Sequence, residues 1–247
     1  MNLTYENMSE SVTKPRLVVL TGAGVSAESG VSTFRDAGGL WENYPVMDVA
    51  SADGFARNPA LVHQFYNERR RQLLDVEPNA AHKAIASLER WYDVWVITQN
   101  VDNLHERGGS TKVLHLHGEL MKVRSIRHPE RVYELTPDNL CTSVDTLDAY
   151  GDHVRPHIVF FQEAVPNIEP AIELVEAADV VVVIGTSMAV YPAAGLINYA
   201  RRGVPVYYID PRPAPVPSSV TVIAATATAG MERLAEILNP ENQVNKQ

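Results

Sequence analysis

The chain has 247 residues and a formal net charge of −9, because 30 acidic residues outnumber 21 lysines and arginines. A hydrophobic content of 45% suits a folded protein with one large core, and no apolar run approaches the roughly 20 residues that span a bilayer. The acidic balance disfavours nucleic-acid binding, and a single cysteine excludes an internal disulfide and a cysteine-based metal cage. We expect a cytoplasmic, monomeric protein without membrane or nucleic-acid partners.

The predicted strands are short, continuous apolar runs. Residues 1–15 come before them, lack the pattern of a secretory signal, and are expected to form a disordered arm. β-branched runs at 16–24, 93–100 and 179–187 are typical of strands covered on both faces. Further strands are expected at 157–161, at 204–211 and near Val220.

Helical segments separate these strands. Pro59 suits a first helical turn, Asn79 is a candidate N-cap, and Gly203 is expected to stop a helix. The predicted helices are 59–75, 79–92, 166–178, 192–203 and 230–239. The alternation predicts an α/β fold with a doubly wound parallel sheet. The polar, aperiodic segment 121–152 interrupts it, and we interpret that segment as an inserted smaller lobe.

The first strand ends in the sequence GAGVSA, where Gly22, Gly24 and Ala27 have the spacing of a G-x-G-x-x-A turn. Glycines at these positions permit close approach of the backbone to a pyrophosphate, although a plain tight turn has the same pattern. A long loop then replaces the second strand and acid of a dinucleotide-binding fold. In that loop, Arg35 is expected to bind phosphate and Phe34 to cover a ring.

Polar side chains also crowd the end of the strand at 93–100, where Gln99, Asn100 and Asp102 follow one another closely. A helix cap would explain one of them but not the group. His105 is expected at the surface or just behind the site. Because ligands bind at the carboxyl ends of parallel strands, this cluster is a candidate binding site.

The sequence LHLHGEL contains His115 and His117, two positions apart. On a strand, both side chains would point to the same face. Gly118 would permit close approach of a ligand. The loop of Gly185, Thr186 and Ser187 is expected at the end of another strand. Asp210 is expected at a further strand end, positioned to accept a hydrogen bond from a ribose hydroxyl.

Five motifs occur along the chain: GAGVSAESGVSTFRDAGGLW, TQNVDNLHERGG, LHGEL, VRPHIVFFQE and GTSMAVYPAAG. Together they resemble the sirtuins, the NAD-dependent protein lysine deacylases, of the class III-like bacterial type. The resemblance covers about residues 16–238 and leaves 239–247 as a tail. It implies a Rossmann-like large domain and a smaller lobe made of about 121–152 and part of 36–80, with NAD and acyl-lysine meeting in the cleft.

The resemblance implies NAD as cofactor and acyl-lysine proteins or peptides as partners. His117 corresponds to the catalytic base, and Asn100 and Asp102 surround the nicotinamide and its ribose. The implied substrate segments are 159–163 and 188–192, including Val159, Phe161 and Val190. The implied NAD-binding residues are Gly22, Ala23, Gly24, Ala27, Phe34, Arg35, Trp41, Gln99, Asn100, Asp102, Gly185, Thr186, Ser187, Asp210 and Ala227, the last within a residue or two.

The implied reaction begins with departure of nicotinamide and attack of the acyl oxygen on the ribose carbon. His117 then accepts a proton from the ribose hydroxyls, and water completes the release of free lysine and O-acyl-ADP-ribose. A histidine suits this step because its unperturbed pKa of about 6.5 leaves it neutral near pH 7. The resemblance assigns no function to His115, which we expect to be structural.

Tyr66 and Arg69 are at i and i+3 of a predicted helix and therefore share a face. A solvated basic face is the plain interpretation, since Arg70 and Arg71 follow. The Tyr-x-x-Arg pattern also resembles the sirtuins that accept acidic acyl groups, in which the pair binds the carboxylate and a small residue, here Ala37, leaves room. We therefore predict desuccinylase and demalonylase activity beside deacetylase activity.

Most sirtuins hold a structural zinc with two Cys-x-x-Cys pairs in the small lobe. Here Ser125 and His128 stand where the first pair is expected, and 146–150 contain no cysteine. A site improvised from His128, Cys141, Asp145 and His153 would lack the thiolates. We predict no metal site and no zinc. Candidate apolar residues to hold the lobe instead are Val132, Leu135, Leu140, Val144 and Leu147.

Two other functions remain open on this scaffold. One is a protein mono-ADP-ribosyltransferase, and the other is a non-catalytic module that binds NAD or ADP-ribose. Intact His117, Asn100 and Asp102 argue against the second. Gln162 stands where sirtuins usually have glycine, a departure that affects the substrate segment without removing a catalytic group.

Overall fold

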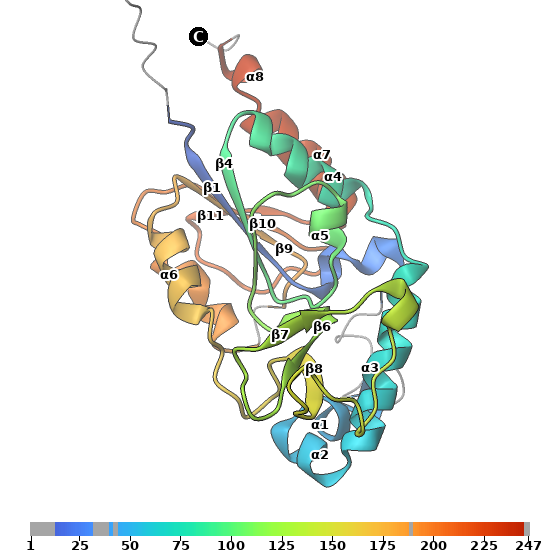
Figure 1. The fold of residues 1–247 in the computed structure, drawn as a ribbon. Coiled ribbons are helices and arrows are strands. Elements are labelled where there is room, and N and C mark those ends of the chain that lie inside the picture. Colours follow the sequence, from blue (N-terminus) through green and yellow to red (C-terminus); the bar gives the residue numbers. More distant parts are fainter. Residues whose placement is uncertain (1–12, 32–39, 42–43, 188–189, 245–247) are drawn as a thin grey trace, which may run out of the picture.

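A computed structural model describes residues 13–31, 40–41, 44–187 and 190–244, with the backbone alone at 40, 41, 243 and 244. Within these ranges the chain forms a six-stranded sheet flanked by helices, with a three-stranded sheet beside it (Figure 1). Of the helices in the described part of the chain, none combines the length and apolar character needed to cross a membrane.

The six-stranded sheet is parallel throughout, in the order β11-β10-β9-β1-β4-β5. From β1 the chain continues to β4 on one side and later returns to β9 on the other, so the strand order reverses between β1 and β9. The predicted doubly wound α/β sheet is confirmed. Its strands are β1 (Arg16–Thr21), β4 (Asp93–Thr98), β5 (Val113–His115), β9 (Val180–Ile184), β10 (Val206–Ile209) and β11 (Val220–Ile223).

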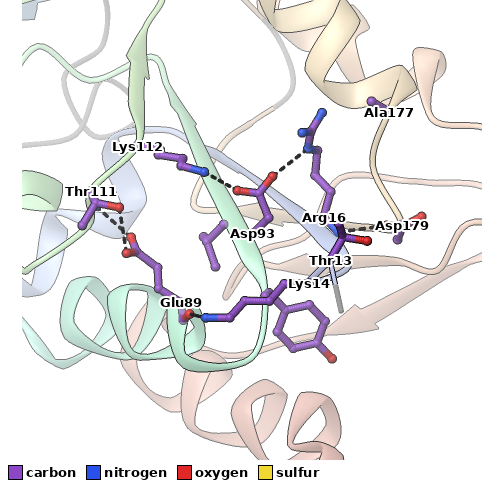
Figure 2. A pocket seen from close by; sticks show the side chains of 11 residues that line it. Thr13, Lys14, Arg16, Glu89, Asp93, Thr111, Lys112, Ala177 and Asp179 are labelled. Carbon is purple, nitrogen blue, oxygen red and sulfur yellow. Dashed lines mark hydrogen bonds and ion pairs between the residues drawn. The ribbon is translucent and has the colours of Figure 1, made fainter. Parts of the chain in front are cut away.

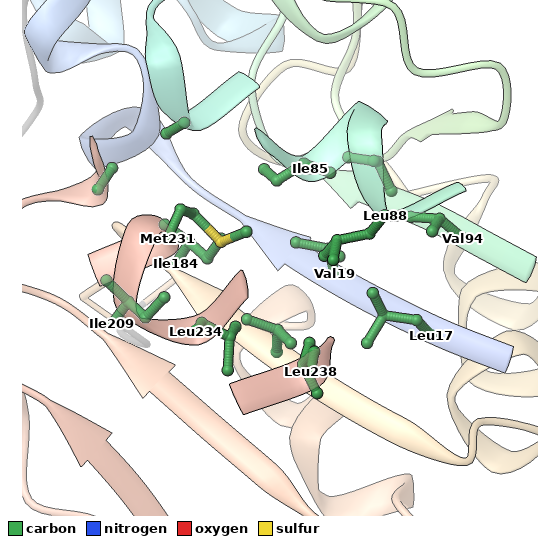
Figure 3. Close-up of a cluster of buried hydrophobic side chains, with 14 of the residues drawn as sticks. Leu17, Val19, Ile85, Leu88, Val94, Ile184, Ile209, Met231, Leu234 and Leu238 are labelled. Atoms are coloured by element: carbon green, nitrogen blue, oxygen red, sulfur yellow. The ribbon is translucent and has the colours of Figure 1, made fainter. Parts of the chain in front are cut away.

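Helices cover both faces of this sheet, which explains the continuous apolar runs. Leu17 and Val19 of β1 pack on one face, and Val18 and Leu20 pack on the other, because successive strand residues alternate. α4 (Ala80–Ser87), the 3-10 turn η4 (Leu88–Arg90) and α7 (Ala227–Leu238) cover the first face (Figure 3). α6 (Ile168–Glu176) and the 3-10 helix η6 (Ala193–Tyr199) cover the second.

Two helix starts follow the expected capping chemistry. α3 (Pro59–Leu74) has Pro59 in its first turn, and the side chain of Asn58 accepts from the backbone of Leu61. At α4, Asn79 accepts from the backbone of His82, whose ring accepts from the Asn79 backbone in return. The two starts were predicted from Pro59 and Asn79, and both are confirmed; the Asn58 cap was not predicted.

The smaller sheet has β6 (Gly118–Ser125) at its centre, antiparallel to β7 (Val132–Glu134) and β8 (Val154–Ile158). Its strands extend beyond residues 121–152 on both sides. Phe65 and Tyr66 of α3 pack with Leu120 and Ile158 of this sheet in a third apolar cluster. The remaining elements nearby are α1 (Val46–Val49), α2 (Ala52–Arg57), α5 (Leu104–Arg107), the 3-10 turn η5 (Pro137–Asn139), and the strand pair β2 (Leu40–Trp41) and β3 (Tyr44–Pro45).

Several expectations differ from the structure. The predicted strand at 157–161 is instead the end of β8, which pairs antiparallel with β6 and does not join the parallel sheet. The helix expected to run to Gly203 is the 3-10 helix η6, which ends at Tyr199; Gly195 inside it disfavours a regular α-helix. The expected tail contains the short helix α8 (Pro240–Val244).

Candidate active site

A cavity of about 530 Å³ lies at the carboxyl edge of the parallel sheet, at the β1/β9 switch point. Ligand pockets in proteins are typically about 300–1,000 Å³ and occur at such switch points. Phe34, Arg35 and Ala37 lie outside the described residues, as does the side chain of Trp41. The other predicted residues all line this cavity: Gly22, Ala23, Gly24, Ala27, Tyr66, Arg69, Gln99, Asn100, Asp102, His117, Val159, Phe161, Gly185, Thr186, Ser187, Val190, Asp210 and Ala227.

The glycines bring two loops into backbone contact. A Cβ atom on Gly24 would lie 2.6 Å from the Cα atom of Gly185, and one on Gly22 would lie 2.9 Å from the Gly185 carbonyl oxygen. The Gly24 amide donates to that oxygen, and Gly185 has a φ of 60°. Close approach is therefore between the loops that follow β1 and β9. A full helix does not follow the glycines; two short 3-10 turns do, η1 (Ala23–Val25) and η2 (Ala27–Ser29).

Ser26 organises the polar loop after β4, although its position in the glycine-rich motif does not predict this function. Its hydroxyl accepts from the side-chain amide of Asn100 and donates to the Asp102 carboxylate, at 3.1 Å in each case. His82 lies 3.4 Å from the same oxygen; since its Nδ1 accepts from the Asn79 amide, its Nε2 carries the proton that it offers to Ser26. These contacts fix the side chains of Asn100 and Asp102.

Asp102 also stabilises the start of α5, because its other carboxylate oxygen accepts a hydrogen bond from the backbone N–H of Leu104. Burial raises the pKa of Asp102, and the hydrogen bonds from Leu104 and Ser26 oppose that rise. Gln99 is fixed from a different direction, since its amide donates to the Thr186 hydroxyl after β9. His105 is only 1% exposed and contacts Thr21, so it lies behind the site and not at the surface.

His117 lies in the cavity with one ring nitrogen fixed. Its Nδ1 is 3.0 Å from the carbonyl oxygen of Gln99. A carbonyl can only accept, so Nδ1 carries the proton and Nε2 has a lone pair available to act as a base. Burial lowers the pKa of His117 below 6.5, opposed by the Gln99 hydrogen bond, and therefore favours the neutral form at neutral pH.

His115 does not share this environment, so the expectation of a common face was wrong. β5 ends at His115, and the chain bends at 116–117 before β6 begins at Gly118. Gly118 has a φ of 87°, and a Cβ atom there would lie 2.0 Å from the His157 carbonyl oxygen. The close approach of β8 thus requires glycine at 118.

The α3 side of the cavity is formed by Tyr66, which is fully buried, and Arg69, which is 9% exposed. Burial lowers the pKa of Arg69 and raises that of Tyr66. Arg70 is also buried and donates to the Leu120 carbonyl and the Thr142 hydroxyl. Of the three arginines 69–71, only Arg71 is exposed to solvent, so the helix does not present a solvated basic face.

The segment 159–163 forms another wall. The Val159 amide donates to the His117 carbonyl, and Phe161 pairs with residues next to α2 through a bridge to Ser51. Glu163 binds Arg155 through two hydrogen bonds and accepts from the Phe160 backbone. Phe161 itself is 42% exposed and lines the cavity.

The loop after β10 forms another part of the cavity wall. Asp210 is 2% exposed, and its carboxylate accepts from the Arg212 amide. Arg212 and Glu28 also line the cavity but were not predicted, although Arg212 follows two residues after the strand-end Asp210. Glu28 accepts from the Thr228 amide in the first turn of α7, beside Ala227.

A larger hollow of about 720 Å³ lies at the opposite, amino edge of the sheet (Figure 2). Its charged side chains have partners within the chain: Asp93 contacts Arg16 and Lys112, and Lys14 donates to the backbone carbonyl oxygen of Glu89. With these charges satisfied, the hollow offers no comparable convergence of polar groups. Among the residues that the structure describes, no group of three or more metal-ligating side chains occurs.

Comparison with known proteins gives consistent matches. A sequence profile of the Sir2 family matches residues 22–192. An NAD-dependent protein deacylase of Bacteroides thetaiotaomicron is 54% identical over 229 residues, covering 91% of this chain and 98% of that protein. A solved Sir2 homolog–NAD complex has a TM-score of 0.81 at 37% identity, covering 93% of this chain and 91% of that chain. A Sir2–p53 peptide–NAD+ complex has a TM-score of 0.76 at 32% identity, covering 91% and 93%.

The family match spans most of the cavity wall, from the glycine loop after β1 to the segment after β9. The structural likeness extends over nearly the whole chain at well above 25% identity. The chain therefore belongs to the Sir2 family, the sirtuins.

Proposed function

We propose that this protein is an NAD-dependent protein lysine deacylase that releases nicotinamide and forms O-acyl-ADP-ribose. The observation that carries the proposal is the meeting of a neutral, proton-accepting His117 with two fixed polar loops in one cavity at the sheet's switch point. The deacylase of Bacteroides thetaiotaomicron, 54% identical, supports the same activity.

The residues of the cavity fit NAD. Amide, hydroxyl and carboxylate groups of Gln99, Thr186 and Asp210 line the same cavity as His117 and Ala227. When bound, NAD would supply the ribose carbon that receives the acyl oxygen. Asn100 and Asp102 would orient the ribose and the nicotinamide, since both side chains are already fixed by Ser26. A relative solved with NAD supports this assignment.

His117 is proposed as the general base. Its Nε2 would accept a proton from a ribose hydroxyl, a contribution typically worth about 10²–10⁴ in rate. The Gln99 carbonyl would keep the ring in the required tautomer throughout. A pKa lowered by burial keeps this nitrogen unprotonated at neutral pH.

Acyl-lysine would enter beside the segment 159–163. Val159, Phe161 and Val190 all line the cavity, and we propose that an extended peptide adds between the segments that carry them. The partner is proposed to be a protein or peptide, as in the peptide-bound relative.

Tyr66 and Arg69 are proposed to bind the carboxylate of succinyl- or malonyl-lysine. A planar guanidinium matches a carboxylate in geometry, and a phenol adds a second donor. Both side chains line the cavity while buried from bulk water, which strengthens a charge-assisted hydrogen bond. We therefore propose deacetylase, desuccinylase and demalonylase activities in one site.

We also propose that the smaller lobe uses no zinc. Ser125, at a position where sirtuins usually have cysteine, accepts from the His128 backbone and so closes a turn. Cys141 is exposed and contacts Arg71. Metal analysis of the purified protein is the test; stoichiometric zinc, or melting on chelation, would contradict this part of the proposal.

The function is tested with a panel of acetyl-, succinyl-, malonyl- and long-chain acyl-lysine peptides incubated with NAD. We expect NAD-dependent release of free lysine, nicotinamide and O-acyl-ADP-ribose from at least the first three. Addition of ADP-ribose to protein without deacylation would indicate a transferase. Binding of NAD without turnover, unchanged in His117→Tyr, would indicate a non-catalytic module.

A further inference from the structure

His115, which the mechanism above does not use, makes two buried contacts behind the catalytic loop. Its side chain is 7% exposed. Nδ1 lies 3.0 Å from the carbonyl oxygen of Asn100, and Nε2 lies 2.8 Å from a carboxylate oxygen of Glu106 on α5. The backbone on the far side is held too, since Asn167 donates to the His115 carbonyl.

The two contacts together determine the number of protons on the ring. A backbone carbonyl can only accept a hydrogen bond, and an ionised carboxylate can only accept as well. Glu106 has a side chain that is 40% exposed, so water can stabilise its ionised form. A neutral imidazole has one N–H and can satisfy only one of the two partners. Both contacts are satisfied when His115 is doubly protonated.

We propose that His115 is a positioning residue that acts as an imidazolium, held by Glu106, to fix the carbonyl of Asn100 and with it the loop 99–102. This inference rests on the proposed function, because that loop is the one assigned to the nicotinamide ribose. Three contacts then fix Asn100. Its backbone carbonyl contacts His115, its backbone N–H donates to the Thr98 hydroxyl, and its side-chain amide donates to the Ser26 hydroxyl.

The electrostatic surroundings agree with this assignment. Burial lowers the pKa of His115, but the hydrogen bond and charge of Glu106 outweigh it and raise the pKa above 6.5. The His115 charge in turn favours the ionised form of the buried Asp102. The titratable and charged groups that face this pair are Asp102 from the loop after β4, His82 from α4, His105 from α5, and Glu119 and Lys122 from β6.

The signs of the two histidine shifts predict a bell-shaped pH profile. His117, with a lowered pKa, must lose its proton to act, so activity rises with pH through that pKa. His115, with a raised pKa, must keep its proton, so activity falls as pH increases through that higher pKa. Two histidines two positions apart would set the opposite limbs of one profile.

Glu106→Gln is the discriminating variant, because glutamine keeps an acceptor of the same shape but removes the charge. Burial then dominates at His115, and we expect its pKa to fall by about one unit or more. The alkaline limb of kcat/KM for acyl-peptide should move to lower pH by the same amount, costing about tenfold in activity on that limb, while the acid limb stays in place. Glu106→Asp should retain part of the wild-type profile.

The matched control is Glu77→Gln. It removes a carboxylate that pairs with Arg107, which lies on helix α5 next to Glu106. It should leave both limbs unchanged. Titration of ¹³C-labelled histidines by NMR, with His115 assigned from His115→Gln, should show its pKa above 6.5 in the wild type and below 6.5 in Glu106→Gln. The proposal is overturned if His115 titrates below 6.5 in the wild type, or if Glu106→Gln leaves the alkaline limb in place.

Failure of the proposed function gives a different pattern. In that case no acyl-peptide is turned over, so kcat/KM cannot be measured. The affinity for ADP-ribose is then measured instead, by calorimetry across the same pH range. A positioning function for His115 predicts that this affinity weakens on the alkaline side and does so earlier in Glu106→Gln. An affinity that does not respond to Glu106→Gln overturns the inference.

Discussion

At the scale of single residues, Arg69 is the side chain whose replacement should separate acyl selectivity from catalysis. Arg69→Met keeps the length of the side chain and removes the guanidinium from the cavity wall. Loss of a charge-assisted hydrogen bond costs about 1.5–3 kcal/mol, so kcat/KM for succinyl-peptide should fall about ten- to a hundredfold. The acetyl group makes no such bond, and its rate should change little. Steady-state kinetics on both peptides are the measurement.

Arg71→Met on the same helix is the control, since Arg71 is exposed and contacts Cys141. It should spare both activities. An equal loss of desuccinylation and deacetylation in Arg69→Met would mean that Arg69 supports the fold of the site and not recognition of the carboxylate.

Gln162 illustrates a backbone cost offset by side-chain contacts. Its φ is 76°, in the left-handed region that favours glycine. Its amide nitrogen donates to the Asp53 carboxylate at 2.7 Å, and its amide oxygen accepts from the Asp53 backbone. Gln162→Ala loses both contacts and keeps the unfavourable φ. Gln162→Gly also loses both contacts, but glycine adopts this φ without the conformational cost.

We expect Gln162→Ala to be less stable than Gln162→Gly by about 1 kcal/mol, the usual cost of this conformation for a residue with a Cβ atom. The free energy of unfolding from urea denaturation measures the difference. An alanine variant as stable as the glycine variant would contradict the structural account of this position.

The limits of residue-level prediction are clear at the paired histidines. The motif context was sufficient to select His117 as the proposed base. The environment of His115 depends on where β5 ends. Strand alternation would place His115 and His117 on the same face, but the bend at 116–117 directs the two side chains to different partners. Neither Glu106 nor the Asn100 carbonyl was identifiable as a partner, because both contacts depend on tertiary structure.

At the scale of elements, the smaller sheet is joined by a polar cluster. Arg131 binds Asp148 at 3.3 Å and also Asp152, and its guanidinium lies 4.7 Å from the ring centre of Tyr150. Tyr133 of β7 donates to Asp148 as well. These contacts connect 125–133 with 146–153, the two stretches where most sirtuins have zinc ligands.

The apolar candidates for this function were largely wrong. Val132, Val144 and Leu147 are 38–52% exposed, and Leu135 is partly buried, whereas Leu140 is buried. The segment 140–142 is instead held by polar groups of α3. Asn67 bonds the backbone of Thr142 in both directions, and Arg70 reaches its hydroxyl.

Arg131→Ala should therefore loosen β7 and the segment 146–153 without disturbing the parallel sheet. Amide hydrogen exchange in those stretches should become faster, while exchange in β1 and β9 should be unchanged. Arg127→Ala is the control, because Arg127 is 78% exposed and makes one long contact with Asp152. Uniform exchange changes throughout the chain would contradict a local connection.

The same contrast explains how much of the fold the sequence could predict. Continuous runs such as VVVVI in β9 are required wherever helices cover both faces of a sheet, so the parallel sheet follows from periodicity. Ion pairs such as Arg131–Asp148 have no period, and their partners are brought together only by the folded chain. A lobe held by such contacts could be recognised as aperiodic, but its strands and its bounds could not be predicted.

At the scale of the whole molecule, the cavity is formed by both parts of the chain. Strand-end loops of the parallel sheet supply Gly22, Gln99 and Gly185, whereas Tyr66 and Phe161 come from the side of α3 and β8. A ligand that fills the cavity touches both parts and binds only when they are folded together. Such binding should stabilise the molecule as one unit.

ADP-ribose at 100 times its dissociation constant should therefore add about 2.7 kcal/mol of stability, because it binds the native state and not the unfolded chain. For a chain of this size, the expected rise in Tm is about 5–10 °C. Thermal unfolding followed by circular dichroism is the measurement. Lys112→Ala, in the hollow at the amino edge of the sheet, is the control and should show the full shift. Loss of the shift in Lys112→Ala would mean that ADP-ribose binds at the amino edge, and no shift in the wild type would mean that the cavity at the carboxyl edge does not take this ligand.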